Sequence, residues 1–233
     1  SFREIAAHLN EPDFDGQAAV DLIIERAAAT SEKKLVILAI GKLTNVALAL
    51  KKAPHIAKDV KLVWLGSNYP DPGEYNLEND PDAVNFLLDT EVEFEIAVVR
   101  YFESSGTSAV RVTMQDLLEK VAGRGPQSPP VSGRNGGVFT CFGDYSVNLL
   151  ENVRMSGKPP SRALYDMAAL AIIKNPVWAQ TREIAAPILN GKDWVDRPQN
   201  RRKIAIREHF DRRAILSDFF STIDDYELTD IAR

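Results

Sequence analysis

The chain has 233 residues, of which 45% are hydrophobic and 26% are charged, and its formal net charge at pH 7 is −5. The acidic balance excludes a strong basic field for nucleic acid or anionic lipid, and no apolar run approaches the roughly 18 residues of a membrane span. The single cysteine excludes an internal disulfide framework and a zinc cluster built on paired thiolates. We therefore expect a soluble globular protein that acts on a small molecule or on another protein. Its localisation stays unknown at this point; the cysteine content is compatible with a reducing cytoplasm and favours that compartment over export.

The first third of the chain predicts a strand, a helix and a second strand. An amphipathic helix begins near Asp15, which we expect to cap it. Leu35–Ile40 is a short, apolar, β-branched run, as expected of a strand covered on both faces. A helix over about 44–57 and a second strand over 60–65 follow. A strand, helix and strand within about 30 residues form a βαβ unit, whose strands are parallel with a right-handed crossover.

The rest of the chain continues the α/β pattern with one interruption. Asp80-Pro81 predicts a capped helix to about Asp89, before a strand over 94–99. The Gly- and Pro-rich stretch 123–137 predicts a long, flexible surface loop. We expect further helices over 146–154, 163–175 and 211–222. Between the last two, two strands of a hairpin or sheet edge are expected over 184–189 and 203–207. The fold class predicted is a single α/β domain over 1–233, with an open, mostly parallel, Rossmann-like sheet flanked by helices.

Polar residues follow the second predicted strand, where an open parallel sheet binds its ligands. Asn68, Glu74 and Asn76 bring carboxylate acceptors and amide groups to this loop. Such groups suit a polyhydroxylated ligand, because a sugar hydroxyl both donates and accepts hydrogen bonds. The alternative is a loop whose Asn and Asp side chains only support turns.

The Gly41-Lys42 pair after the first predicted strand invites comparison with a phosphate-binding loop. The Walker pattern needs a glycine five residues before Gly41, and Val36 stands there, inside the strand. We therefore do not expect a nucleotide phosphate site at this position.

Several segments, in order, resemble the inosine/uridine-type nucleoside hydrolases. The stretch GKLTNVALAL at 41–50 is similar to the family's G-P-L-T-N-x-A-x-A-L segment. The spacing of Asn68, Glu74-Tyr75-Asn76 and Asp80-Pro81 is similar to its N…E-F-N…D-P-E-A stretch. The resemblance implies that Asn68, Glu74 and Asn76 bind the ribose hydroxyls of a nucleoside.

Two further segments resemble the parts of the family that carry the metal and the leaving group. Ser104–Thr107 occupies the place of L-D-V-T, whose threonine offers a backbone carbonyl to calcium. Ala163–Ala171 resembles L-H-D-P-L-A-V-A, in which the aspartate is a calcium ligand and the histidine helps the base leave. The resemblance therefore implies Thr107 and Asp166 as Ca²⁺ ligands, and Asp166 and Tyr165 as catalytic residues. The likeness runs from about Asp15 to 116 and more loosely from 163 to 220.

The resemblance implies an enzyme that cleaves the N-glycosidic bond of a ribonucleoside to ribose and free base, with water activated by Ca²⁺. Its partners would be a nucleoside or ribose and a second copy in a homo-oligomer, with no nucleic acid and no membrane.

Two departures from the family pattern favour an alternative, a non-catalytic nucleoside- or sugar-binding relative. The family's aspartate-rich opening strand, D-x-D-x-x-x-D-D, has no counterpart before Asp15. Tyr165 stands where the family often has histidine, and a phenol with a reference pKa near ~10 is a poor general acid at neutral pH. A third reading is an interaction subunit whose open sheet edge is filled by a partner.

The predicted calcium ligands are few. Calcium binds about 6–8 oxygens, whereas the resemblance gives this sequence only Asp166 and the Thr107 carbonyl. We therefore expect weak metal binding and little or no hydrolase activity from these 233 residues alone.

Overall fold

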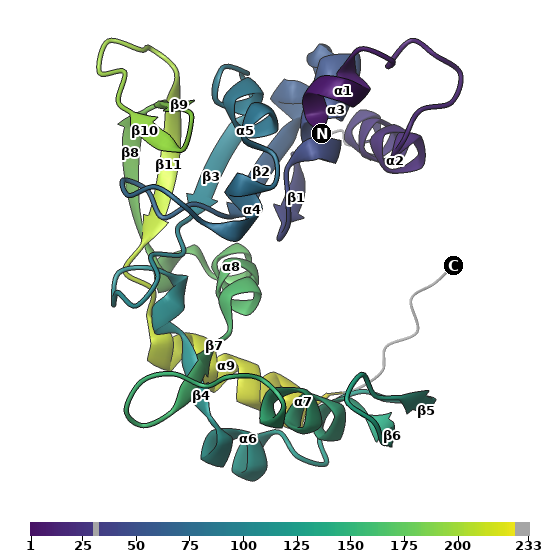
Figure 1. Ribbon diagram of the computed structural model, residues 1–233, viewed down its shortest axis with the longest axis vertical. Coiled ribbons are helices and arrows are strands. Elements are labelled where there is room, and N and C mark those ends of the chain that lie inside the picture. Colours follow the sequence, from purple (N-terminus) through teal and green to yellow (C-terminus); the bar gives the residue numbers. More distant parts are fainter. Residues whose placement is uncertain (30–32, 227–233) are drawn as a thin grey trace. The chain divides into compact units, whose positions relative to one another are not determined.

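The chain folds into two compact units in the computed structural model, which describes residues 1–29 and 33–226 (Figure 1). Unit 1 comprises residues 1–108 and 165–210, and unit 2 comprises residues 109–164 and 211–226. The chain thus leaves unit 1 after residue 108, builds most of unit 2, returns to unit 1 at residue 165, and enters unit 2 again at residue 211. That the two units act as a single domain stays a prediction.

A five-stranded sheet forms the centre of unit 1, in the order β1-β2-β3-β11-β8. The first four strands are parallel and β8 runs antiparallel at the edge, so the predicted open, mostly parallel sheet is confirmed. The strand register places Ala39 beside Trp64, and Trp64 beside Ile96. The strands span Leu35–Ala39 (β1), Val60–Leu65 (β2), Glu93–Ala97 (β3), Gln180–Ala185 (β8) and Lys203–Glu208 (β11), with a small hairpin of Ile188–Asn190 (β9) and Asp193–Val195 (β10).

Helices flank both faces of this sheet. Side chains of α1, α2, α3 and α5 share one buried core with Leu62, Trp64 and Phe94 of the strands. α8 packs against β2 with buried residues that do not belong to that core, so it covers the other face. The helices span Phe2–Ala6 (α1), Gln17–Ala28 (α2), Thr44–Lys52 (α3), Tyr75–Glu78 (α4), Pro81–Leu88 (α5) and Tyr165–Lys174 (α8), with 3₁₀ turns at Pro54–Asp59, Thr107–Ala109 and Pro176–Trp178.

The helix ends of unit 1 confirm one predicted cap and correct two predictions. Asp80 caps α5, accepting a hydrogen bond from the Ala83 N–H, as the sequence indicates. α2 is capped by Gly16 and not by Asp15, because Gly16 takes the left-handed conformation (φ 84°) that glycine adopts without strain. The helix predicted to reach residue 57 ends at Lys52, since Pro54 lacks an N–H and disfavours helical geometry in the residue before it.

Unit 2 contains three helices and two small antiparallel ladders among its described residues. The strand pair β4–β7 joins Arg111–Thr113 to Ser161–Ala163. α7 packs against β6 and against α6. The helices span Met114–Lys120 (α6), Phe142–Glu151 (α7) and Arg212–Asp224 (α9).

The loop predicted over 123–137 is instead part of a hairpin. Gln127–Ser132 (β5) pairs antiparallel with Val138–Cys141 (β6). The prolines are tolerated because a two-stranded ribbon has two edge strands, where a missing N–H costs no central hydrogen bond. Two of the glycines, Gly136 and Gly137, lie in the connecting turn with φ values of 87° and 83°. The Gly and Pro content therefore predicted the turn correctly, but the prediction that this stretch contains no strands was wrong.

Among the described residues, none of the helices combines the length and apolar character that a membrane crossing requires.

Candidate functional site

The loop after β2 carries the three residues predicted to bind a sugar. The chain folds back on itself there, with Asn68 bridged to Asp71. Ser67 and Glu74 have φ values of 72° and 143°, a region that side-chain-bearing residues rarely adopt. Backbone strain of this kind persists only where the surroundings over-determine it, and it clusters at functional sites.

Glu74 closes this loop from inside. Its side chain is buried, and Oε2 accepts hydrogen bonds from the backbone N–H of Ser67 and of Leu77, both at 3.0 Å. The carboxylate thereby caps α4 and ties both ends of the loop together. The second oxygen, Oε1, accepts no hydrogen bond from the described part of the chain. One oxygen of this carboxylate is structural, and the other is not used in a hydrogen bond among the described residues.

The two asparagines are held by their amide nitrogens. Asn76 Nδ2 donates to the Leu65 carbonyl at 2.9 Å, and Asn68 Nδ2 makes a long contact of 3.5 Å to the Pro72 carbonyl. Asn68 Oδ1 is buried and has no donor within the described residues. The Asn76 oxygen also lacks a hydrogen-bond donor there. Glu74 and the two asparagines therefore each keep an acceptor oxygen that has no donor among the described residues.

The loop after β3 brings a second set of groups to the same end of the sheet. Arg100 and Phe102 both have positive φ, at 46° and 65°, on either side of Tyr101. The Arg100 guanidinium is buried, donates to the Tyr69 carbonyl at 3.0 Å and pairs with Glu208 at 2.6 Å. Arg100 thus fixes this loop to the loop after β2 and to the end of β11.

Tyr101 connects the loop after β2 to the start of α8. Its ring lies 6.1 Å from the ring of Tyr165, edge to face. Burial and the charge of Glu74 raise the pKa of Tyr101, while a hydrogen bond from the Tyr75 backbone acts to lower it. The segments that carry Glu74 and Tyr165 therefore both lie near Tyr101.

Asp166 lies in the first turn of α8, beside Tyr165. Asp166 is an exposed residue overall, yet the atoms packed around its carboxyl group desolvate it enough to raise its pKa. A carboxylate in that state gains from a nearby positive charge, whether a cation or a developing charge on a substrate.

Thr107 is entirely buried, and its hydroxyl has no hydrogen-bond partner among the described residues. Its backbone N–H bonds to the Val98 carbonyl at 2.8 Å, which fixes the segment against the end of β3. Across residues 1–29 and 33–226, no three His, Cys, Asp or Glu side chains gather closely enough to hold a metal ion. Asp166 and Thr107 therefore do not build a metal centre with other acidic residues of the described chain.

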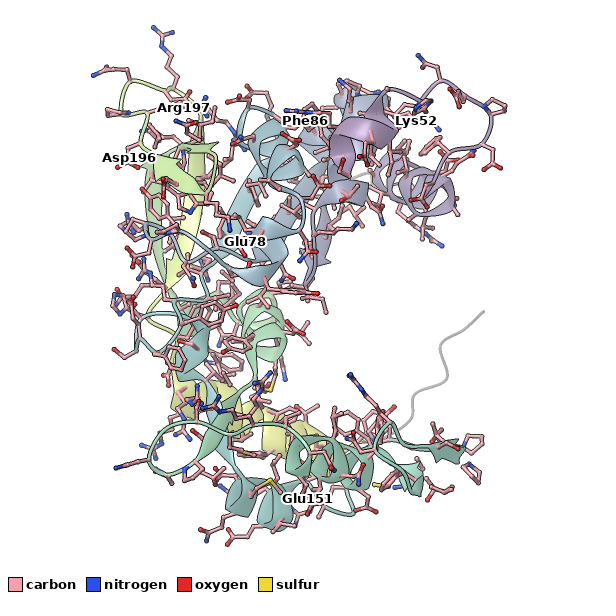
Figure 2. The ribbon with its side chains drawn as sticks, viewed as in Figure 1. Lys52, Glu78, Phe86, Glu151, Asp196 and Arg197 are labelled. Atoms are coloured by element: carbon pink, nitrogen blue, oxygen red, sulfur yellow. The ribbon has the colours of Figure 1, made fainter. Side chains whose placement is uncertain are left out.

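Side chains near β10 also hold the loop after β2, through Tyr69. The Tyr69 hydroxyl donates to Asp196 at 2.8 Å, and its ring meets Trp194 at 5.5 Å, nearly perpendicular. Figure 2 shows Asp196 next to Arg197, just beyond β10. Burial, followed by the Asp196 carboxylate, raises the pKa of Tyr69 to about 12.

Sequence reasoning missed Tyr101 and the Arg100–Glu208 pair. Arg100 and Tyr101 follow the end of β3, which was the available signal, but the ion-pair partner Glu208 is the last residue of β11 and lies 108 positions from Arg100. Only the adjacency of β3 and β11 in the sheet brings those residues together.

Comparison with known proteins gives a family match over most of the chain. The family model described as inosine-uridine preferring nucleoside hydrolase matches residues 5–216. A probable uridine nucleosidase 1 of Oryza sativa subsp. japonica is 36% identical over 90 residues, which are 36% of this chain and 26% of that protein. An uncharacterized protein of Schizosaccharomyces pombe is 30% identical over 112 residues, which are 45% of this chain and 36% of that protein.

Solved structures show the same fold at low sequence identity. An inosine-uridine preferring nucleoside hydrolase from Bacillus anthracis has a TM-score of 0.61 at 19% identity, covering 87% of this chain and 63% of that one. A purine-preferring ribonucleoside hydrolase from Gardnerella vaginalis has a TM-score of 0.59 at 20% identity, covering 87% and 64%. The chain thus spans less than two thirds of these solved chains, and its matches cover about a third of the curated relatives.

Proposed function

Because the chain belongs to the inosine-uridine preferring nucleoside hydrolase family, we propose that its site binds a ribonucleoside for cleavage of the N-glycosidic bond to ribose and free base. The observation that carries the proposal is the set of unfilled acceptor oxygens on the loop after β2, above all the buried Oδ1 of Asn68. A buried acceptor without a donor costs free energy, so the site gains when a ligand hydroxyl supplies one.

The three acceptors match the chemistry of a pentose. Each ribose hydroxyl can donate one hydrogen bond, and Asn68, Glu74 and Asn76 offer oxygens for three. Their other polar atoms are already bonded to the backbone, so the oxygens need not be ordered when the sugar arrives. Such preorganisation reduces the entropy lost on binding.

The proposed chemistry of the site is electrostatic. Departure of the base leaves positive charge on the sugar ring, and the uncompensated Asp166 carboxylate would stabilise that charge. Tyr165 would face the base and act on it by ring contact or by donating a hydrogen bond from its hydroxyl.

Calcium, which the resemblance implies, does not fit the described residues by themselves. Ca²⁺ requires about 6–8 oxygen ligands, and the described residues contain no cluster of three acidic or His/Cys side chains. The Thr107 side chain is enclosed, which leaves its carbonyl and one carboxylate, Asp166. We therefore expect at most weak calcium binding by the described residues.

A second candidate is a protein that binds a nucleoside or ribose without cleaving it. The described residues contain no cluster of three side chains able to hold a metal ion, which favours this candidate, because the resemblance implies a metal ion to activate the attacking water. It shares the sugar-binding residues with the hydrolase, so the two candidates differ only in whether base is released.

Calorimetry with ribose tests the sugar site. We expect Asn68→Ala to weaken ribose binding about 5- to 10-fold, the loss of one hydrogen bond. The matched control Asn152→Ala removes an exposed asparagine of unit 2, whose Nδ2 bonds to the Asn148 carbonyl, and should leave ribose affinity unchanged. Equal affinity of the wild type and Asn68→Ala for ribose, or no ribose binding at all, would overturn the proposed sugar site.

A second measurement separates the two candidates. Free ribose is assayed after incubation with inosine or uridine, with and without millimolar calcium. Slow release that Asp166→Asn abolishes supports the hydrolase, whereas ribose binding with no release supports the binding protein. Robust release by the 233-residue chain would contradict the expected weak activity.

A further inference from the structure

Tyr101 holds an unusual position between the two halves of the proposed site. It belongs to neither of the segments that the sequence singled out for sugar binding or catalysis. Its ring contacts the ring of Tyr165 at 6.1 Å with an interplanar angle of 87°. Burial and the charge of Glu74 raise the pKa of Tyr101, and a hydrogen bond from the Tyr75 backbone acts to lower it.

Hydrogen bonds and an uncommon backbone geometry restrain the segment around Tyr101. The residues on both sides, Arg100 and Phe102, have positive φ, and the Arg100 side chain is pinned to Tyr69 and Glu208. The carbonyl of Arg100 also accepts a hydrogen bond from the Ser108 hydroxyl. Only 40% of Tyr101 is exposed, whereas its neighbour Phe102 is 88% exposed. The contact with Tyr165 is what restrains the Tyr101 ring, and the more exposed Phe102 serves as the aromatic control.

The edge-to-face contact with Tyr101 restricts the orientation of the Tyr165 ring. Aromatic pairs of this geometry gain from the fit between the positive edge of one ring and the negative face of the other. Without Tyr101, the Tyr165 ring would lose this contact and sample more rotamers, and a ligand packed on it would bear the cost of ordering it.

We propose that Tyr101 is a positioning residue that fixes the ring of Tyr165 for the planar base of a bound nucleoside. The inference rests on the proposed function, because it assigns the base to the side of the site where Tyr165 lies. It adds that discrimination between a nucleoside and free ribose depends on the loop after β3, whereas sugar affinity depends on the loop after β2.

Calorimetry with ribose and with inosine tests the inference. Tyr101→Ala should weaken inosine binding about 10-fold, within the range for an aromatic pair, and change ribose affinity less than 2-fold. Tyr101→Phe keeps the ring and should restore inosine affinity to within about 3-fold of the wild type. Phe102→Ala should leave both affinities unchanged.

A double variant distinguishes positioning from direct contact or from a structural role. In Tyr165→Ala, adding Tyr101→Ala should cause no further loss of inosine affinity, since Tyr101 acts through Tyr165. Equal losses for ribose and inosine in Tyr101→Ala, failure of Tyr101→Phe to rescue, or additive losses in the double variant would each overturn the inference while leaving the sugar site standing. A wild-type chain that binds neither ligand would overturn the proposed function and this inference with it.

Discussion

The buried Arg100–Glu208 pair should be the strongest single electrostatic contribution to the loops of the proposed site. Glu208 receives hydrogen bonds from Arg100 at 2.6 Å and from Arg182 at 2.7 Å. The side chains of Arg100 and Glu208 are 9% and 10% exposed, whereas that of Arg182 is 46% exposed. Glu208→Gln therefore leaves Arg100 as a buried, uncompensated charge, while Arg182 regains water.

The expected cost follows from that difference in exposure. Removing one partner of a buried ion pair costs about 3–5 kcal/mol, and an exposed pair is worth only about 0–1 kcal/mol. Because glutamine can still accept one hydrogen bond, we expect a loss of about 3 kcal/mol for Glu208→Gln. Glu78→Gln is the matched control, since the Glu78 and Lys192 side chains are 44% and 79% exposed; we expect it to cost less than about 1 kcal/mol.

Urea unfolding followed by tryptophan fluorescence measures this loss in unit 1, because Trp64, Trp178 and Trp194 all lie there. The pH dependence supplies an independent check. The hydrogen bond from Arg182 lowers the pKa of Glu208, burial opposes this, and the bond from Arg100 lowers it further. A carboxyl whose folded pKa is depressed stabilises the protein above its unfolded pKa and loses that contribution as the pH falls through the folded pKa.

The stability gap between the wild type and Glu208→Gln should therefore be complete at neutral pH and narrow below about pH 4.3, the ordinary pKa of glutamate. A gap no larger than that of Glu78→Gln, or one that persists undiminished into strong acid, would refute the reasoning.

Three further predictions concern the same unit. Asp80→Ala should lower the free energy of unfolding by about 3 kcal/mol, because the Phe2 and Ala83 N–H groups and the Thr44 hydroxyl lose a buried acceptor; urea denaturation beside the exposed Asp82→Ala checks this, and equal midpoints would contradict it. Gly106→Ala should lower the free energy of unfolding by at least about 2 kcal/mol, because the new Cβ would lie 2.1 Å from the Val99 carbonyl oxygen. Gly41→Ala, whose new Cβ would have no atom within 4 Å, is the control and should change the stability little; thermal melting of both variants checks this. Asp196→Asn should lower the pKa of Tyr69 from about 12 without returning it to the ordinary value, because burial is the larger cause; an ultraviolet titration of the phenols detects this, and an unchanged curve would exclude the Asp196 contribution.

Local sequence determined the elements whose causes are local. The apolar runs of β1 and β2 predict buried parallel strands, and Asp80-Pro81 predicts the start of α5, because a cap and a proline act within one turn of their own position. The same approach failed at 127–141, where Gly and Pro content obscured a hairpin whose prolines lie on edge strands.

The residue types of the proposed sugar site were also readable from the sequence, since Asn68, Glu74 and Asn76 lie close together along the chain. The sequence did not show which side-chain atoms of these residues bond to the loop and which have no partner. One oxygen of Glu74 accepts hydrogen bonds from the loop backbone, and the buried side-chain oxygen of Asn68 has no donor among the described residues. Both features depend on how the loop folds back toward the end of β2. The contact of Tyr101 with Tyr165 and the pairing of Arg100 with Glu208 were decided by tertiary structure alone, because a parallel sheet gathers the ends of strands that the sequence keeps far apart.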